Sequence, residues 1–209
     1  QQASRLRFVE HHQQDARAVD VLFIATSYNF AQYQYELAIK HAQMIIDWSK
    51  ALGTDKTAKH KVDTKTLLES RVIKAHSLYA SADFVLAEPA YQAVLSSLPK
   101  GDKRRSAFIE NLAACVFKQA EALLADGKKA LAVDELLRVA IVAPYSTLRA
   151  SAEYDAAKEA QGMLEMKISK LEETLAGARL IDESQLDNSK VLVLSKVKIK
   201  NMSNNMEMD

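Results

Sequence analysis

The sequence of 209 residues has few of the residues that interrupt helices or cross-link a chain. It contains five glycines, three prolines and one cysteine. So little glycine and proline argues against an all-β domain rich in turns and suits long helices. The single cysteine, Cys115, excludes an internal disulfide bond. Because 48% of the residues are hydrophobic, the chain can bury a sizeable core.

The sequence also lacks an excess of charge of either sign. Its 28 basic and 27 acidic residues leave a formal net charge of +1, so no overall field steers the chain to nucleic acid or an anionic membrane. The apolar runs, such as residues 139–143, are far too short to cross a bilayer. The amino terminus has neither an initiator methionine nor the apolar run of a signal peptide. We therefore expect a piece of a longer protein, with no direct membrane insertion.

A helical packing pattern returns along the chain. In its clearest copy an aromatic residue is followed by a small residue, an aromatic, a branched apolar residue and a proline, at intervals of three, four, three and five. The same intervals recur forty-five residues later, and a looser copy lies upstream. The copies are Phe84, Ala87, Tyr91, Val94 and Pro99; Lys129, Ala132, Leu136, Val139 and Pro144; and Tyr35, Ala38, Ala42 and Ile45. Such recurrence indicates stacked helical hairpins.

Apolar residues at helical spacing predict eight helices. Their expected bounds are residues 3–30, 35–52, 67–81, 84–98, 104–125, 128–143, 147 to about 163, and 167–178. The first helix could break near residues 13–15. Gly53 should end the second, and Gly127 should close the fifth in a left-handed conformation. Pro89 cannot donate a backbone hydrogen bond, so the helix that contains it should begin late or kink.

Two segments fit no helix clearly. Residues 53–65 have no periodic apolar face and predict a long loop, after which Asp63 and Thr64 can cap a helix. Residues 191–200 could form a helix of an incomplete repeat or, because of their alternation, a strand. We therefore predict a helical repeat domain over residues 1–180 and an incomplete terminal repeat with a frayed tail over residues 181–209.

The phased pattern resembles the tetratricopeptide repeat superfamily, in which each repeat is a pair of antiparallel helices. Ala38, Ala87 and Ala132 match the small position that lets the two helices approach closely. The resemblance covers about residues 17–180 and implies an all-α, right-handed superhelix of stacked helix pairs. It has departures, because the period exceeds the family's usual length of about thirty-four residues and Leu171 stands where alanine is expected.

A second resemblance concerns residues 132–157 (AVDELLRVAIVAPYSTLRASAEYDAA). This stretch is similar to repeats of large tetratricopeptide proteins of the Gram-negative bacterial envelope, including those of the outer-membrane assembly type. That resemblance implies a protein-binding scaffold in the periplasm. The cytoplasm is the alternative, since one cysteine suits either compartment.

Motifs for catalysis or metal binding are missing from the sequence. A ferritin-like di-metal site needs a glutamate followed three residues later by a histidine, and no glutamate here has that neighbour. The five histidines form no His-Glu-x-x-His zinc pattern. Cys115 lies among apolar residues and is expected to be buried rather than nucleophilic. We expect no enzymatic activity, no cofactor and no metal.

The basic clusters, residues 100–105 and 190–200, have no interleaved aromatic residues on which bases could stack, so nucleic acid is not an expected partner.

The first helix of each pair should line a concave groove. The family's groove positions fall here on Asp20, Phe23, Ser27, Glu69, Val72, His76, Tyr79, Phe117 and Glu121, with Phe30, Ala114 and Leu124 beside them. This mixture of apolar and acidic residues suits a partner helix or an extended peptide. The alternative is that Phe23, Val72 and Phe117 belong to the core.

The function expected from these patterns is a non-catalytic scaffold that binds a protein or peptide partner in the groove. The alternative is self-association of a larger repeat protein through its open terminal repeat, near residues 191–199, which would give a homo-oligomer. An enzyme on a helical frame is a third possibility, for which no converging set of residues is found.

Overall fold

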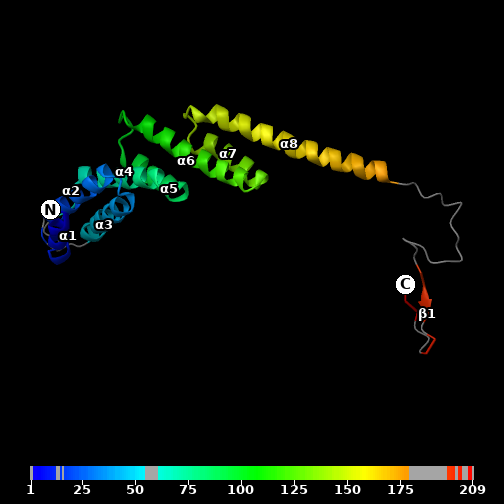
Figure 1. Cartoon of the computed structure of the whole chain (residues 1–209), viewed down its shortest axis with the longest axis horizontal. Helices are drawn as coiled ribbons and strands as arrows, with labels where there is room; N and C mark the ends of the chain where they lie inside the picture. The colour runs from blue at the N-terminus through cyan, green and yellow to red at the C-terminus, as the bar shows by residue number, and fades with distance from the viewer. Residues whose placement is uncertain are drawn as a thin grey trace. The chain divides into compact units, whose positions relative to one another are not determined.

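The computed structural model describes residues 2–12, 15, 17–54, 61–178, 197–200, 202–203 and 207–208. These residues form eight helices and one short strand pair, so the fold is all-α as predicted (Figure 1). The helices are α1 (Gln2–His11), α2 (Arg17–Ala31), α3 (Tyr35–Thr54), α4 (Thr64–Ala80), α5 (Phe84–Ser97), α6 (Arg105–Ala125), α7 (Lys129–Val142) and α8 (Leu148–Gly177). The strands are β1 (Ile199–Lys200) and β2 (Glu207–Met208).

The chain forms two compact units, Gln1–Met166 and Lys167–Asp209. In the first unit each helix from α1 to α6 packs against the next, and α2 also contacts α4 (Figure 1). Successive helices are antiparallel, which confirms the predicted pairing. Short connections between antiparallel helices favour this arrangement, because each helix buries its apolar face against its neighbour in the sequence.

The three alanines of the repeat pattern lie between helices. Ala38, Ala87 and Ala132 are each 0% exposed. The distance between two helix axes depends on the size of the side chains at their contact. A methyl side chain at the contact therefore lets the two helices approach closely. This prediction is confirmed.

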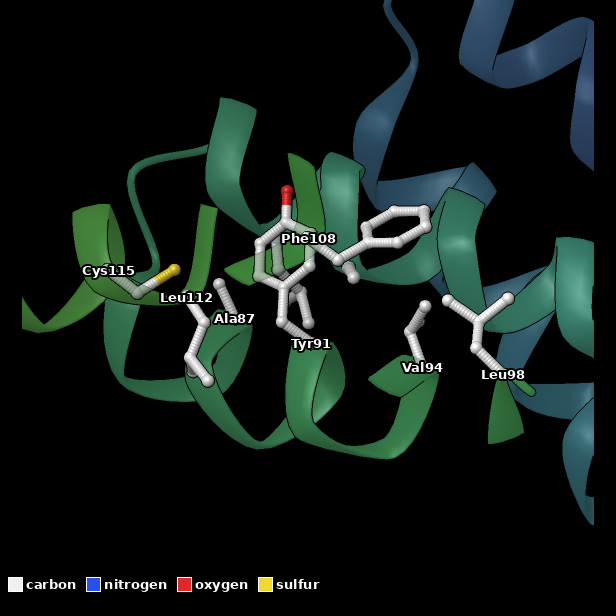
Figure 2. Packing of buried hydrophobic residues seen from close by; sticks show 9 residues of the cluster. Ala87, Tyr91, Val94, Leu98, Phe108, Leu112 and Cys115 are labelled. Carbon is white, nitrogen blue, oxygen red and sulfur yellow. The ribbon is translucent and has the colours of Figure 1, made fainter. Parts of the chain in front are cut away.

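The largest group of buried residues joins α4, α5 and α6 (Figure 2). Tyr91 lies at its centre, with its ring centroid 6.3 Å from that of Phe108 and 6.4 Å from that of Tyr79. Its hydroxyl group forms a hydrogen bond of 2.8 Å with His76 Nδ1. The buried tyrosine therefore contributes apolar area to the core and has a partner for its polar atom.

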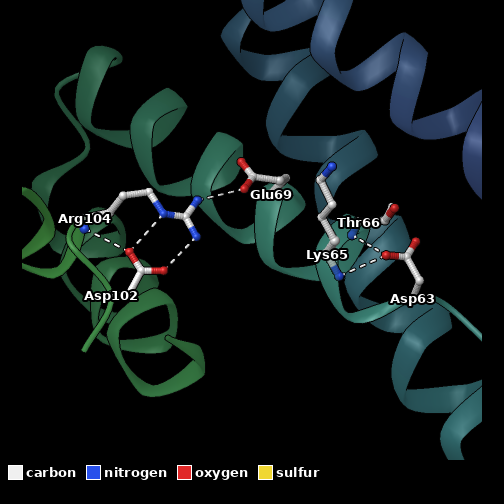
Figure 3. Close-up of polar contacts among 6 residues, drawn as sticks. All are labelled: Asp63, Lys65, Thr66, Glu69, Asp102 and Arg104. Carbon is white, nitrogen blue, oxygen red and sulfur yellow. Dashed lines mark hydrogen bonds and ion pairs between the residues drawn. The ribbon is translucent and has the colours of Figure 1, made fainter. Parts of the chain in front are cut away.

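Two helix ends follow the capping residues predicted from the sequence. The Asp63 side chain accepts hydrogen bonds of 2.9 Å from the backbone N–H groups of Lys65 and Thr66 (Figure 3). Gly127 has a φ of +73° after α6, the left-handed conformation that glycine adopts without steric cost. Both assignments are confirmed.

One predicted helix end is wrong, because helix α3 continues through Gly53 to Thr54, whose hydroxyl group donates to the carbonyl of Ala51 at 2.9 Å. Helix α5 begins at Phe84, in agreement with its predicted bounds, so it does not begin late and Pro89 lies inside it. The alternative, a kink at Pro89, stays a prediction. Val85, four residues earlier, is exposed. The carbonyl group that loses its donor can therefore be hydrated.

The number of helices agrees with the prediction, but the division of the chain differs. The segment 3–30 is divided into α1 and α2, near the predicted break. The two helices predicted within residues 147–178 form the single helix α8 of 30 residues. No proline lies between residues 163 and 167, so nothing there terminates the helix.

The described part of the second unit comprises the end of α8 and the strand pair. Ile199 pairs with Met208 in an antiparallel register, and Lys198 Nζ lies 2.7 Å from Glu207 Oε2. Of the segment left open between helix and strand, residues 199–200 are therefore strand. Residues 191–196, on which the expected terminal repeat depends, lie outside the described residues. The domain boundary at residue 180 stays a prediction.

Among the helices that the structure describes, none combines the length and apolar character needed to span a bilayer.

Enlarging a buried alanine should disturb the helix packing. Ala132→Leu places extra methyl groups between α7 and its neighbours and should lower the free energy of unfolding by about 1–3 kcal/mol. Ala130→Leu, on the exposed side of the same helix, should change it by less than about 0.5 kcal/mol. Urea denaturation followed by circular dichroism measures both. Equal effects of the two substitutions would contradict the burial of Ala132.

Candidate functional site

The predicted groove residues lie on α2, α4 and α6, but most of them make contacts within the protein. Phe23 packs on the buried cluster of α1, α2 and α3. Val72 and Tyr79 pack on the cluster around Tyr91. Phe117 packs on the cluster of α6, α7 and α8. These aromatic and branched side chains are therefore partly buried against the core, and their exposure in a partner-binding groove stays a prediction.

The predicted acidic groove residues differ in their surroundings. Glu69 accepts from Arg104 at 2.9 Å, and Arg104 also binds Asp102 at 3.1 Å (Figure 3). Glu121 lies 2.5 Å from Lys118 on its own helix. Asp20 is exposed and Ser27 is partly buried, both on α2. Two of the three acids are thus engaged in ion pairs, and their predicted role in selecting a charged partner stays a prediction.

His41 and His76 each form a hydrogen bond with an uncharged side chain, Asn29 and Tyr91 respectively. Asn29 Nδ2 donates to His41 Nδ1 at 3.0 Å, which requires an unprotonated ring nitrogen. His76 binds Tyr91, and its ring centroid lies 6.4 Å from that of Phe30 and 5.8 Å from that of Phe108. Burial lowers the pKa of both histidines. For His41, the nearby charge of Lys40 adds to this effect.

Protonation of these histidines should destabilise the fold. The pKa of histidine in an unfolded chain is about 6.5. The pKa of each of these two residues is lower in the folded protein. The unfolded chain therefore binds more protons between the two pKa values, and the free energy of unfolding should fall as pH is lowered from about 7.5 to about 5. Urea denaturation across this range measures the slope. The double variant His41→Gln/His76→Gln should flatten it, and an unchanged slope would contradict this assignment.

Cys115 is buried and is not placed for nucleophilic chemistry. Burial, with a smaller contribution from the charge of Glu88, raises the pKa of its thiol to about 12. The thiol is thus protonated at neutral pH and packs as a small apolar group. Among the residues that the structure describes, no three His, Cys, Asp or Glu side chains are grouped so that they could hold a metal ion.

A polar cluster that the sequence did not reveal joins α5, α6 and α7. The buried side chain of Glu88 pairs with Arg138 and accepts from Gln119 Nε2 at 2.9 Å. Arg138 also pairs with Glu135, whose pKa is raised by burial. A buried carboxylate needs such partners, because an unpaired charge in the interior is strongly destabilising. We interpret this cluster as a determinant of helix register.

The start of α8 is fastened to α6 by one carboxylate. Glu110 accepts from Ser146 Oγ at 2.6 Å and from the backbone N–H of Thr147 at 2.9 Å. These hydrogen bonds lower the pKa of Glu110, that from Ser146 most strongly. Ser146 Oγ also accepts from the backbone N–H of Leu148 at 3.1 Å and so provides an acceptor for the first N–H group of α8.

Removal of this carboxylate should loosen the first turn of α8. Glu110→Ala leaves Ser146 and Thr147 without their acceptor and should lower the free energy of unfolding by about 1–3 kcal/mol. Glu153→Ala removes an exposed pair with Arg149 and should cost less than about 1 kcal/mol. Urea midpoints separate these outcomes. A loss no larger than that of Glu153→Ala would show that Glu110 does not hold the helix.

Helix α8 changes character along its length. In the first unit Ala152 and Ala156 are buried against α6 and α7. In the second unit Ile168, Leu171 and Leu175 are 52%, 68% and 75% exposed, and we name these three residues the α8 stripe. Their spacing of three and four residues places them on one helix face. Leu171, which departs from the small residue expected by the repeat pattern, is therefore not at a packed contact between helices.

Comparison with known proteins gives a match in this part of the chain. The family model described as "Transcription elongation factor, N-terminal", of the GreA and GreB proteins, matches residues 138–180. The chain is 79% identical over 61 residues to transcription elongation factor GreA of Flavobacterium johnsoniae, 29% of this chain and 39% of that protein. The GreA protein of Christiangramia forsetii is 74% identical over 61 residues, which are 29% of this chain and 39% of that protein. The GreA protein of Amoebophilus asiaticus is 57% identical over 54 residues, which are 26% of this chain and 34% of that protein.

The chain thus spans about two fifths of the length of the Flavobacterium relative, over the 61 aligned residues. The match overturns the resemblance to tetratricopeptide proteins. Residues 138–157, interpreted as part of an envelope repeat, lie within the elongation factor segment. The reason is physical, because small and apolar residues at helical spacing are required in any packed helix pair and do not identify a family.

The predictions that depended on this resemblance are also wrong. The expected groove-binding scaffold, its alternative of self-association through a terminal repeat, and the periplasmic envelope setting are not what the match supports. The exclusion of nucleic acid is wrong as well, because the relatives are factors of transcription elongation, a process in which nucleic acid is both template and product. The absence of aromatic residues among the basic clusters was a poor criterion, because it tests only for base stacking.

Proposed function

We propose that residues 138–180 act in transcription elongation, through contact with an elongation complex of RNA polymerase, template and transcript. The observation that carries this proposal is the 79% identity over 61 residues to GreA of Flavobacterium johnsoniae. The proposal concerns binding to the complex. It does not extend to the whole activity of the relatives, because the 61 aligned residues are 39% of that protein.

The α8 stripe supplies the contact surface in this proposal. Ile168, Leu171 and Leu175 are apolar and exposed, whereas such side chains are normally buried in a core. Burial of one large apolar side chain contributes roughly 1.5–3 kcal/mol. Three such side chains on one helix face can therefore anchor a helix in an apolar groove of a partner.

We also propose that the chain acts by binding and catalyses no reaction of its own. The groups best suited to chemistry have structural partners: Cys115 is buried with a raised pKa, and His41 and His76 are held by Asn29 and Tyr91. A factor that acts by binding fits these surroundings. Its place would be the bacterial cytoplasm, where transcription occurs, rather than the periplasm.

The proposal is tested with the full chain and a reconstituted elongation complex from Flavobacterium johnsoniae. Binding is measured by the anisotropy of a fluorophore on the chain as the complex is titrated. Leu171→Lys should weaken binding by at least about ten-fold, because a desolvated apolar anchor commonly contributes 2 kcal/mol or more. Substitution of an exposed side chain should leave circular dichroism and the urea midpoint unchanged.

Leu131→Lys is the matched control, because Leu131 is an exposed leucine of α7 outside the matched segment. It should not change the affinity. Absence of saturable binding by the unsubstituted chain would refute the proposed function. An equal loss with Leu131→Lys would refute the α8 stripe as the contact surface.

A further inference from the structure

A groove between α3, α4 and α5 is a second candidate binding site. The inference drawn from it does not depend on the proposed function. The volume of the groove is about 490 Å³, within the range of small-ligand pockets. Each helix turns one face to it, since the lining residues recur at helical spacing. The residues on which the inference depends are Ile39, Lys50, Arg71, Lys74, Leu78 and Leu86, and we name this site the α3–α5 groove.

Two hydrogen bonds fix the order of these residues along the groove. Lys74 Nζ donates to Gln43 Oε1 at 2.6 Å and thereby sets the register of α3 against α4. Arg71 Nη1 donates to Ser97 Oγ and sets that of α4 against α5. Because neighbouring helices are antiparallel, residues before Gln43 on α3 lie beside residues after Lys74 on α4.

The groove is consequently polarised. Ile39, Leu78 and Leu86 line one end, towards the start of α3 and the connection from α4 to α5. Lys50 and Arg71 line the opposite end, and Lys74 lies between the two ends. One half of the site is therefore apolar and the other cationic.

The cationic half is only partly neutralised by the protein. Among the described residues Asp47 is the carboxylate that approaches this end, with Oδ1 3.9 Å from Lys50 Nζ. Neither Arg71 nor Lys74 has a carboxylate partner in the described ion pairs, and both bind neutral side-chain oxygens. Burial lowers the pKa of Lys74, which means that its charge is poorly solvated. An anion at this position would stabilise that charge.

We infer that the α3–α5 groove binds a single-chain aliphatic carboxylate, with the carboxylate at Arg71 and Lys74 and the hydrocarbon chain along Ile39, Leu78 and Leu86. Charge complementarity selects the anionic head, because two cations can donate charge-assisted hydrogen bonds to it. The apolar half selects an aliphatic tail, because none of its lining residues is aromatic and none of them is a hydrogen-bond donor through its side chain.

Isothermal titration calorimetry with the full chain and four probes tests the chemistry of the ligand. Decanoate should bind at one site. Propionate lacks the tail, decanol lacks the charge and decylammonium reverses it, so each should bind at least about ten-fold more weakly. Equal affinity for decanoate and decanol would overturn the inference, and so would the absence of decanoate binding.

Variants test the position of the ligand. Lys74→Met and Arg71→Met should each weaken decanoate binding by about ten-fold or more, since each removes one charge-assisted hydrogen bond. Leu86→Gln should weaken it from the other end of the groove, and Leu86 is exposed enough for the fold to tolerate the change. Lys40→Met is the matched control, because Lys40 is an exposed lysine of α3 that does not line the groove.

The outcomes are decisive in combination. If Leu86→Gln and either cation variant weaken binding while Lys40→Met does not, the inference holds. If Lys40→Met weakens binding as strongly as Lys74→Met, decanoate responds only to surface charge and the inference fails. Binding to vesicles of anionic phospholipid without binding of decanoate would also overturn it, because the site would then recognise a membrane surface.

Discussion

The close approach of successive helices at buried alanines is the constraint on which the rest of the first unit depends. Ala38, Ala87 and Ala132 are completely buried on α3, α5 and α7, the second helix of each pair. Larger side chains there would hold the helices apart, and the aromatic residues that pack beside them would lose their neighbours. Because each helix contacts mainly its neighbours in sequence, a local change of spacing would be passed to the next pair.

Polar contacts between distant parts of the sequence depend on this spacing and in turn specify it. The Glu88–Arg138 pair and the contact of Glu110 with Ser146 join helices that are far apart in the chain. Buried or half-buried charges add little net stability, but they penalise any register that separates them. The apolar core therefore supplies the driving force of folding, and these pairs select one arrangement of the helices.

The two regions with proposed binding roles differ in origin. The α3–α5 groove is built by three packed helices, so its shape depends on the core. The α8 stripe needs only one helix, because residues three and four apart share a face without tertiary contacts. It lies in the segment matched by the elongation factor model, whereas the groove lies outside residues 138–180. The two surfaces can therefore be tested independently.

Local signals in the sequence were sufficient for the all-α class, the capping roles of Asp63 and Gly127, and the buried alanines. They failed for the family, because periodic small and apolar residues satisfy the packing of any helix pair. They also left open whether Phe23, Val72 and Phe117 face the core or a groove, since spacing identifies a helix face but not whether that face meets solvent or another helix; all three are partly buried against the core.

The sequence by itself thus determined where most of the helices lie, because helix formation depends on neighbours within a few positions. Only the tertiary structure decided that Glu69 pairs with Arg104, that α8 is exposed beyond Met166, and that Arg71 and Lys74 face one groove. These properties depend on the register between helices. Register is set by many weak contacts between residues far apart in the chain, and no local pattern encodes it.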